Sequence, residues 1–64
     1  MTQKELAYLE DAIGHEKTII AICQESIKYL QDESLITFIE NEIPKHEQTK
    51  RDLMHMLEVK VNEW

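Results

Sequence analysis

The sequence lacks the residues with which many small folds make turns or hold themselves together. It has one cysteine, Cys23, so no disulfide can form within the chain. One glycine, Gly14, and one proline, Pro44, are too few turn formers for a chain of many β-hairpins. A domain of 64 residues also builds only a small core. The composition favours one all-helical domain, residues 1–64, that is marginally stable by itself.

Long hydrophobic runs and sorting signals are also missing. The longest uncharged run, 18–24, is far shorter than the roughly 20 apolar residues that a membrane helix requires. No basic segment followed by an apolar one stands at the N-terminus, where a secretion signal has both. A lone thiol without such a signal fits a reducing compartment. We therefore expect a cytoplasmic protein that does not insert into a membrane.

Basic residues are scarce relative to acidic ones. Seven Lys and Arg stand against thirteen Asp and Glu, which gives a formal charge of −6. Nucleic-acid binding depends on clustered basic side chains that release counterions, and only Lys50 and Arg51 are adjacent here. The charge therefore predicts a solvated acidic surface and no nucleic-acid partner.

Apolar residues in the first half of the chain recur at alternating spacings of three and four. This spacing places them in one stripe along an α-helix. Thr2 and Glu5 have the spacing of a capping box, which marks a helix start. The pattern predicts a helix over about 3–30. The stripe consists of Leu6, Leu9, Ile13, Glu16, Ile20, Cys23, Ile27 and Leu30.

A second apolar stripe follows, out of phase with the first by about two residues. The phase change predicts a turn at 31–32, although one unbroken helical rod is the alternative. Asp32 is the expected N-cap of a second helix over 33–62. Because the stripe stays in phase across Pro44, we expect a kink there rather than a helix end. This stripe consists of Ile36, Ile39, Ile43, His46, Lys50, Leu53, Leu57 and Val61.

The two helices are expected to fold back as an antiparallel hairpin, which buries one stripe of each helix. Several large apolar residues lie outside both stripes, and monomers rarely expose such a surface. We therefore predict a homodimer, or a higher helical assembly, in which two hairpins form a four-helix bundle. A helix from another protein is the alternative partner. The predicted interface is Tyr8, Ile19, Ile22, Tyr29, Leu35, Phe38 and Met56.

Two polar residues, Glu16 and His46, interrupt the stripes at similar distances from the turn. The simpler interpretation is an ion pair that fixes the helix register. The alternative is a metal site for iron, manganese or zinc, since di-iron bundles place a Glu on one helix and Glu-x-x-His on the next. Ile43 stands where that second Glu belongs, and Glu42 is the nearest acid. We therefore predict that the chain binds no metal or other cofactor.

Catalytic residues are not evident either. Cys23 lies within the first stripe, where a thiol acts as a small hydrophobic side chain. No glycine-rich phosphate loop is present. The sequence predicts a protein without enzymatic activity.

A family resemblance rests on residues 2–11, 16–17 and 32–35, on His46 and on the Leu-rich segment 53–57. In these residues the chain resembles the small CotF-type spore coat proteins of endospore-forming Firmicutes. The resemblance implies a ferritin-like helical hairpin that self-associates. It also implies a structural role in sporulation, with other coat proteins as partners on the developing spore. This chain lacks the family's proline after Asp32, and it adds Pro44.

A shorter segment, 38–43, resembles a stretch of Sda, a helical-hairpin inhibitor of sporulation histidine kinases. This resemblance implies a different function, in which the exposed apolar residues contact the helix bundle of a sensor kinase instead of a second copy of the chain.

Overall fold

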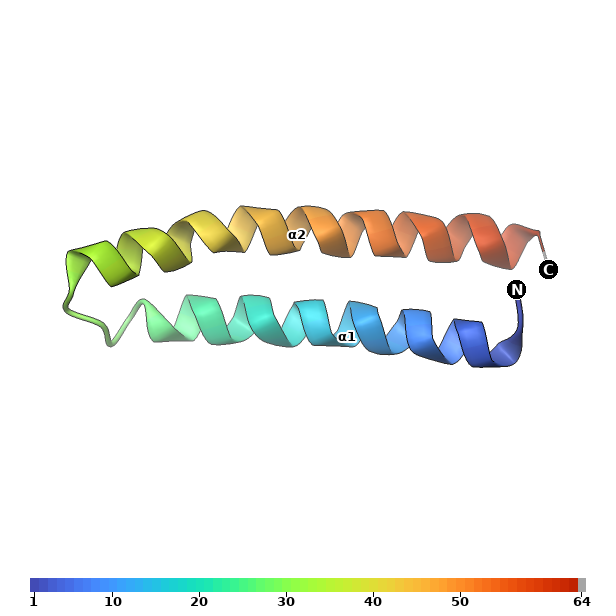
Figure 1. Cartoon of the computed structure of the whole chain (residues 1–64), viewed down its shortest axis with the longest axis horizontal. Helices are drawn as coiled ribbons and strands as arrows, with labels where there is room; N and C mark the ends of the chain where they lie inside the picture. The colour runs from blue at the N-terminus through green and yellow to red at the C-terminus, as the bar shows by residue number, and fades with distance from the viewer. Residues whose placement is uncertain (64) are drawn as a thin grey trace.

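The computed structural model describes residues 1–63 as two antiparallel helices joined by a short connection (Figure 1). Helix α1 spans Gln3–Ser26 and helix α2 spans Glu33–Asn62. The hairpin measures 48 × 16 × 11 Å between Cα atoms, so the two helices form a single layer. The predicted all-helical hairpin is confirmed, and the unbroken rod is excluded. Neither helix is long and apolar enough to cross a membrane.

The start of α1 is a capping box, as the sequence predicts. The Thr2 hydroxyl accepts a hydrogen bond of 3.0 Å from the Glu5 backbone N–H. In return the Thr2 backbone N–H donates to Glu5 Oε1 at 2.8 Å. This backbone hydrogen bond, with a smaller contribution from the Thr2 side chain, lowers the pKa of the Glu5 carboxyl. Two backbone donors that the helix leaves unpaired are thereby satisfied.

Helix α1 ends at Ser26, four residues before the predicted end at Leu30. The backbone tightens here, because Tyr29 and Leu30 both donate their N–H groups to the Ser26 carbonyl, at 3.1 and 3.2 Å. Such short-range hydrogen bonds close the last turn of a helix. Ile27 and Leu30 remain half-buried beyond the helix. The apolar spacing therefore continues past the α-helix, which explains why the sequence pattern overestimates its length.

Asp32 caps the start of α2, as predicted. Its Oδ1 accepts hydrogen bonds from the Ser34 hydroxyl at 2.6 Å, the Ser34 N–H at 2.9 Å and the Leu35 N–H at 3.1 Å. The Ser34 hydroxyl contributes most to lowering the pKa of the Asp32 carboxyl, followed by the Leu35 N–H. The negative charge also lies at the positive end of the helix dipole.

The Asp32 cap predicts one component of the acid sensitivity of the fold. A carboxyl with a lower pKa in the folded state stabilises the fold above its unfolded-state pKa. This stabilisation is lost as the pH falls through the folded-state pKa. Asp32→Asn retains a capping oxygen that does not titrate. Between neutral pH and about pH 3, we expect the melting temperature to fall further for the wild type than for Asp32→Asn. Circular dichroism melts at several pH values measure this, and parallel profiles would contradict it.

Helix α2 continues through Pro44 without interruption. Proline has no N–H to donate to the Glu40 carbonyl, and Figure 1 shows the ribbon of α2 bending gently in its first half. Ile43 and His46, on either side of the proline, are both half-buried. The apolar stripe therefore stays in phase across Pro44, as expected.

The core between the helices is thin. Only Ile13 and Ile20, with exposed fractions of 7% and 8%, are buried among the residues that the structure describes. The other stripe residues of both helices are mostly half-buried. The large apolar side chains that remain exposed are Tyr8, Ile22, Tyr29, Leu35, Phe38, Met54, Met56, Val59 and Val61.

Val61 is an exception to the predicted second stripe. Its side chain is exposed, and Lys60 is half-buried near the end of α2. Lys60, not Val61, continues the alternating spacing of three and four after Leu57. The inward positions of α2 therefore keep a mean period of about 3.5 residues to the end of the helix, which is the period of two helices that wind around each other.

Candidate functional site

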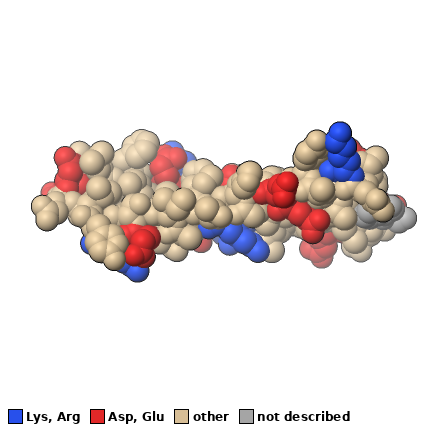
Figure 2. Space-filling view, turned by 90° about the horizontal axis from the view of Figure 1, so that it is seen from below, with Lys and Arg blue, Asp and Glu red and all other residues tan. Residues whose placement is uncertain are grey.

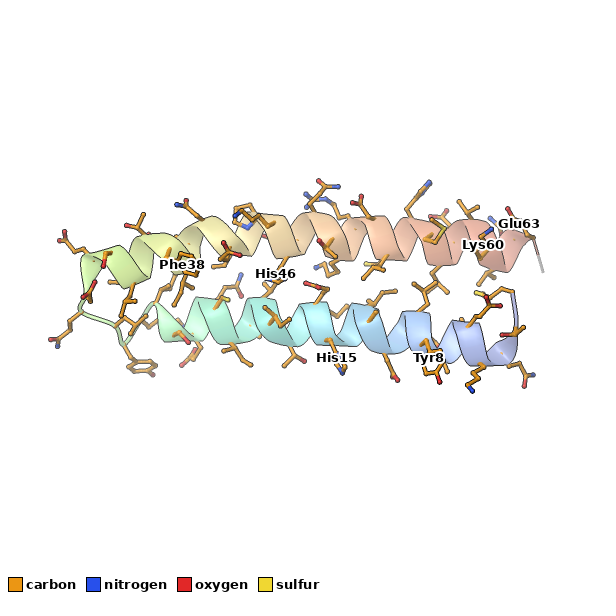
Figure 3. The ribbon with its side chains drawn as sticks, viewed as in Figure 1. Tyr8, His15, Phe38, His46, Lys60 and Glu63 are labelled. Atoms are coloured by element: carbon orange, nitrogen blue, oxygen red, sulfur yellow. The ribbon has the colours of Figure 1, made fainter. Side chains whose placement is uncertain are left out.

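A polar pair joins the two helices near the middle of the hairpin. His46 Nδ1 lies 2.6 Å from Glu16 Oε2, and the side chains are 30% and 17% exposed, respectively. His46 lies between the helices in Figure 3. Because the partners are 30 residues apart in sequence, their hydrogen bond fixes which turn of α1 faces which turn of α2. The prediction that these two residues meet is confirmed.

The pair also determines which imidazole nitrogen is available to other groups. An ionised carboxylate can only accept, so His46 Nδ1 carries a proton and donates it to Glu16. When His46 is neutral, its Nε2 is consequently an acceptor. A carboxylate that orients a histidine in this way also occurs in metal and catalytic sites, but those sites add further ligands or a nucleophile.

The three candidate metal ligands do not come together within one hairpin. Within residues 1–63, no three His, Cys, Asp or Glu side chains are grouped closely enough to hold a metal ion. Glu42 forms an ion pair of 3.1 Å with Lys45 instead of joining Glu16 and His46. A metal site built on Glu16 and His46 would need ligands from a second chain.

The polar pair predicts a measurable coupling between the helices. We expect Glu16→Ala and His46→Ala each to lower the free energy of unfolding by about 1–3 kcal/mol, because each leaves a partly buried polar group without its partner. The double substitution should cost less than the sum of the two. This double-mutant cycle consists of the wild type, the two single variants and the double variant. Urea denaturation of the four proteins measures the coupling energy between Glu16 and His46.

A control for this cycle is Lys28→Ala, which removes an exposed ion pair. Lys28 Nζ lies 3.1 Å from Glu25, and the two side chains are 65% and 58% exposed. Such surface pairs contribute about 0–1 kcal/mol. Additive effects of the Glu16 and His46 substitutions would contradict a specific pairing.

One broad side of the hairpin carries an apolar groove near the chain termini. Its volume is about 550 Å³. Lys60 and Glu63, at one end of it, pair with each other at 3.3 Å. Lys4 Nζ lies 5.8 Å from the centre of the Tyr8 ring, a cation–π distance. The groove is lined by Met1, Glu5, Tyr8, Leu9, Ala12, Met56, Lys60 and Glu63.

Helical periodicity places further large apolar residues on this side at intervals along the hairpin. Phe38 and Met56 are 18 residues apart, which is five turns of α-helix, so they point in the same direction from α2. Tyr8 and Ile19 are 11 residues apart, or about three turns of α1. We call this side the apolar face, defined by Tyr8, Ala12, Ile19, Phe38 and Met56.

The opposite broad side carries a smaller groove of about 280 Å³. It is lined by Glu10, Ile13, Gly14, Lys17, Met54 and Leu57. Glu47 is two turns before Met54 and lies on the same side of α2. We call this side the opposite face. The hairpin therefore has two unequal faces, and the large exposed aromatic side chains of Tyr8 and Phe38 lie on one of them (Figure 3).

The seven predicted interface residues are exposed in the single hairpin, except that Ile19 is half-buried. Four of them, Tyr8, Ile19, Phe38 and Met56, define the apolar face. Ile22 is 14 residues, or about four turns, after Tyr8, so it lies on the same side of α1. Tyr29 lies in the connection, and Leu35 is in the first turn of α2.

The groove is the feature that the sequence prediction missed. The small side chain of Ala12 lies between the larger Tyr8 and Ile19 in the sequence pattern of α1, and it lines the groove. The small Ala12 among larger apolar residues was the sequence signal for a groove. It indicates a groove only because Met56 of α2 lies opposite Ala12 in the folded hairpin.

Three ion pairs near the apolar face form within the same hairpin. The pairs Glu16–His46, Glu42–Lys45 and Lys60–Glu63 are all formed. Figure 2, a view onto the edge formed by α1, shows acidic and basic residues spread along the hairpin with uncharged surface between them. The apolar face therefore does not depend on a partner of opposite charge.

Comparison of the chain with protein-family models, curated proteins and solved structures finds no match to any of them.

Proposed function

We propose that the chain is a non-enzymatic, self-associating structural protein. Two hairpins pack through their apolar faces and form an antiparallel four-helix bundle of the ferritin-like kind. The observation that carries this proposal is the imbalance, among residues 1–63, between two buried apolar side chains and nine exposed large ones. Apolar surface contributes about 25 cal/mol per Å² when it is removed from water, so a second layer supplies the core that one layer lacks.

The size of the apolar face supports a second hairpin as the partner. The broad side measures 48 by 16 Å between Cα atoms, a footprint of about 770 Å². A stable interface buries about 800 Å² on each partner. Face-to-face packing of two hairpins uses the whole broad side and produces the two-layer architecture of a helix bundle.

Charge gives this association a distinct salt dependence. Two chains with a formal charge of −6 each repel one another. Three ion pairs near the apolar face are already formed within each hairpin, which leaves the repulsion between the two net charges as the main interaction that salt screens. Self-association should therefore strengthen as salt is added, whereas binding to a basic partner would weaken.

A structural component of the spore coat is the cellular role that we propose for this assembly. The chain would be made in the cytoplasm and assemble with other coat proteins on the developing spore. The support for this part of the proposal is the sequence resemblance to CotF-type proteins at 2–11 and 53–57.

Two methionines of α2 provide a matched test of the proposed association. Met56 lies on the apolar face and Met54 on the opposite face, with similar exposed fractions of 49% and 45%. We expect Met56→Lys to raise the dimer dissociation constant at least tenfold, a cost of about 1.4 kcal/mol. Met54→Lys should leave the dissociation constant within about threefold of the wild-type value.

Light scattering over a concentration series measures both variants. Equal effects, or a larger effect of Met54→Lys, would contradict the use of the apolar face. A wild-type chain that stays monomeric throughout would contradict self-association, and it would favour a helical partner such as the kinase bundle that the Sda resemblance implies.

A further inference from the structure

We infer that a second copy lies with its connection over the termini of the first, so that α1 packs on α1 and α2 packs on α2 in antiparallel pairs. The two-fold axis lies in the plane between the two apolar faces and crosses both helices at right angles, level with His15. The inference rests on the proposed self-association and specifies how the two copies are placed. It starts from the spacing of the apolar side chains along each helix.

Two-fold symmetry leaves few ways for two identical faces to meet. An axis that turns one broad side of a hairpin toward the same side of a second copy lies in the plane between them. When the helices of the two layers stay aligned, as in a bundle, this axis runs either across the helices or along them. An axis across the helices stacks each helix on its own copy and exchanges the ends of the hairpin. An axis along the helices stacks α1 on α2 of the second copy, with like ends together.

The apolar residues of α2 are symmetric about residue 47. Phe38 and Met56 are each nine residues from it, and both lie on the apolar face. An axis across α2 at this level therefore places Phe38 of each copy on Met56 of the other. The side chains are 64% and 49% exposed in the single hairpin, and a thioether favours an aromatic neighbour. Phe38 of the second copy thereby covers the α2 wall of the groove, to which Met56 belongs.

The apolar residues of α1 are symmetric about His15, which lies near the middle of that helix (Figure 3). Tyr8 and Ile22 are each seven residues from His15, so the same kind of axis places Tyr8 of each copy on Ile22 of the other. Ala12 is three residues before His15 and Ile19 is four residues after it. The small side chain of Ala12 therefore meets the large side chain of Ile19. Ile22 of the second copy covers the Tyr8 wall of the groove.

The polar pair shows that the two centres of symmetry lie at the same level. His15 is one residue before Glu16, and residue 47 is one residue after His46. Because the helices are antiparallel, both centres lie about 1.5 Å from the pair in the same direction, toward the termini. The hydrogen bond between Glu16 and His46 holds these turns of α1 and α2 side by side. One axis therefore satisfies the spacing of both helices at once.

The same axis brings two carboxylates together. Glu42 and Asp52 are each five residues from residue 47, so Glu42 of one copy lies level with Asp52 of the other. Glu42 pairs with Lys45 at 3.1 Å, and Asp52 accepts a hydrogen bond of 2.8 Å from Gln48, within each hairpin. The remaining repulsion between the copies is screened by salt, in agreement with an association that salt strengthens.

An axis along the helices fits the surface less well. It would place Ile19 of one copy over the Glu42–Lys45 pair of the other, because Ile19 is three residues after Glu16 and Ile43 is three residues before His46. It would also place groove over groove. Two facing grooves of about 550 Å³ each would leave a large void, which a close-packed core does not tolerate.

Cysteine cross-linking distinguishes the two axes. In a Cys23→Ser background, chains with His15→Cys are mixed with chains with Thr49→Cys and oxidised, and the products are identified by mass spectrometry. A disulfide requires Cα atoms about 4.4–6.8 Å apart. An axis across the helices brings the two copies of position 15 together, whereas an axis along them brings position 15 over position 49. Both positions are exposed, and the apolar side chains of the face are retained.

A second mixture tests the register of α2. It combines chains with Glu42→Cys and chains with Asp52→Cys in the same background. An axis across the helices joins these two positions, and an axis along them joins neither to any of these cysteines. Removal of two facing carboxylates does not weaken the association, so this mixture reports the arrangement without loss of apolar contact.

We expect the disulfide between two His15→Cys chains to exceed the mixed product about tenfold or more in the first mixture. In the second mixture the mixed disulfide should exceed both same-site products by a similar factor. A mixed product in excess in the first mixture, or statistical products in either, would overturn the arrangement. The molar mass of the Cys23→Ser parent separates this failure from failure of the proposed function. A dimeric parent with the wrong disulfides refutes only the geometry, whereas a monomeric parent refutes both.

Discussion

Replacing Phe38 by Asp should raise the dimer dissociation constant about 100-fold or more. Phe38 is 64% exposed in one hairpin, and in the proposed bundle its ring is covered by the partner hairpin. A carboxylate at this position would have to be desolvated without a partner. A symmetric dimer contains the substitution twice, so its cost is counted twice. Sedimentation equilibrium measures the change directly.

The control for this prediction is Asn41→Asp, three residues along the same helix. Asn41 is exposed and points away from α1, and the substitution adds the same charge with almost no change in shape. Its dissociation constant should remain within about threefold of the wild-type value. An equal loss in both variants would attribute the effect to net charge instead of to the apolar face.

Melting experiments extend the Phe38 prediction to stability. A dimer that supplies much of its own core should melt at a temperature that rises with protein concentration. Phe38→Asp should melt at a lower temperature with little dependence on concentration. A wild-type melting temperature that does not change with concentration would show that the hairpin is stable without a partner.

Replacing Ile20 by Asp should unfold the hairpin. Ile20 and Ile13 are the two buried apolar residues among those that the structure describes. An ionised carboxylate at this position costs several kcal/mol. A small domain has little stability beyond that. Far-ultraviolet circular dichroism at 25 °C should show loss of most of the helical signal.

The matched control is Ala21→Asp, at the next residue of α1. Ala21 is exposed, so the same carboxylate stays in water there. Its cost should be about 0.7 kcal/mol or less, the difference in helix propensity between the two residues. A folded Ile20→Asp protein with a wild-type spectrum would contradict the account of a core that depends on so few residues.

Periodicity is the reason that much of the structure could be predicted from the sequence. The capping box at Thr2, the N-cap at Asp32 and the pairing of Glu16 with His46 all follow from residue spacing along helices. These features depend on local backbone geometry and on which residues of the two apolar stripes lie opposite each other. The local geometry and this pairing are both determined once the chain turns near Asp32.

Other features depend on contacts that spacing does not specify. The end of α1 at Ser26 is determined by short-range hydrogen bonds, while Ile27 and Leu30 continue the apolar pattern. The groove depends on Ala12 and Met56 lying opposite one another across two helices. The sequence pattern places Met56 in the predicted interface, but the groove beside it forms only when the two helices pack.

The polar pair has a consequence for specificity. Replacing both Glu16 and His46 by Leu removes two partly buried polar groups and adds apolar contact, so stability need not fall. The hydrogen bond that aligns the helices would be lost, however.

The most direct test of the central claim is the molar mass of the wild-type chain in solution. Light scattering from about 1 μM to about 1 mM, at low and high salt, covers the range in which such interfaces form. The account predicts a rise from the chain mass of 7.6 kDa to twice that value, at lower concentration when salt is high. A mass that stays at 7.6 kDa under every condition, with the exposed Tyr8 and Phe38 still in solvent, would contradict it.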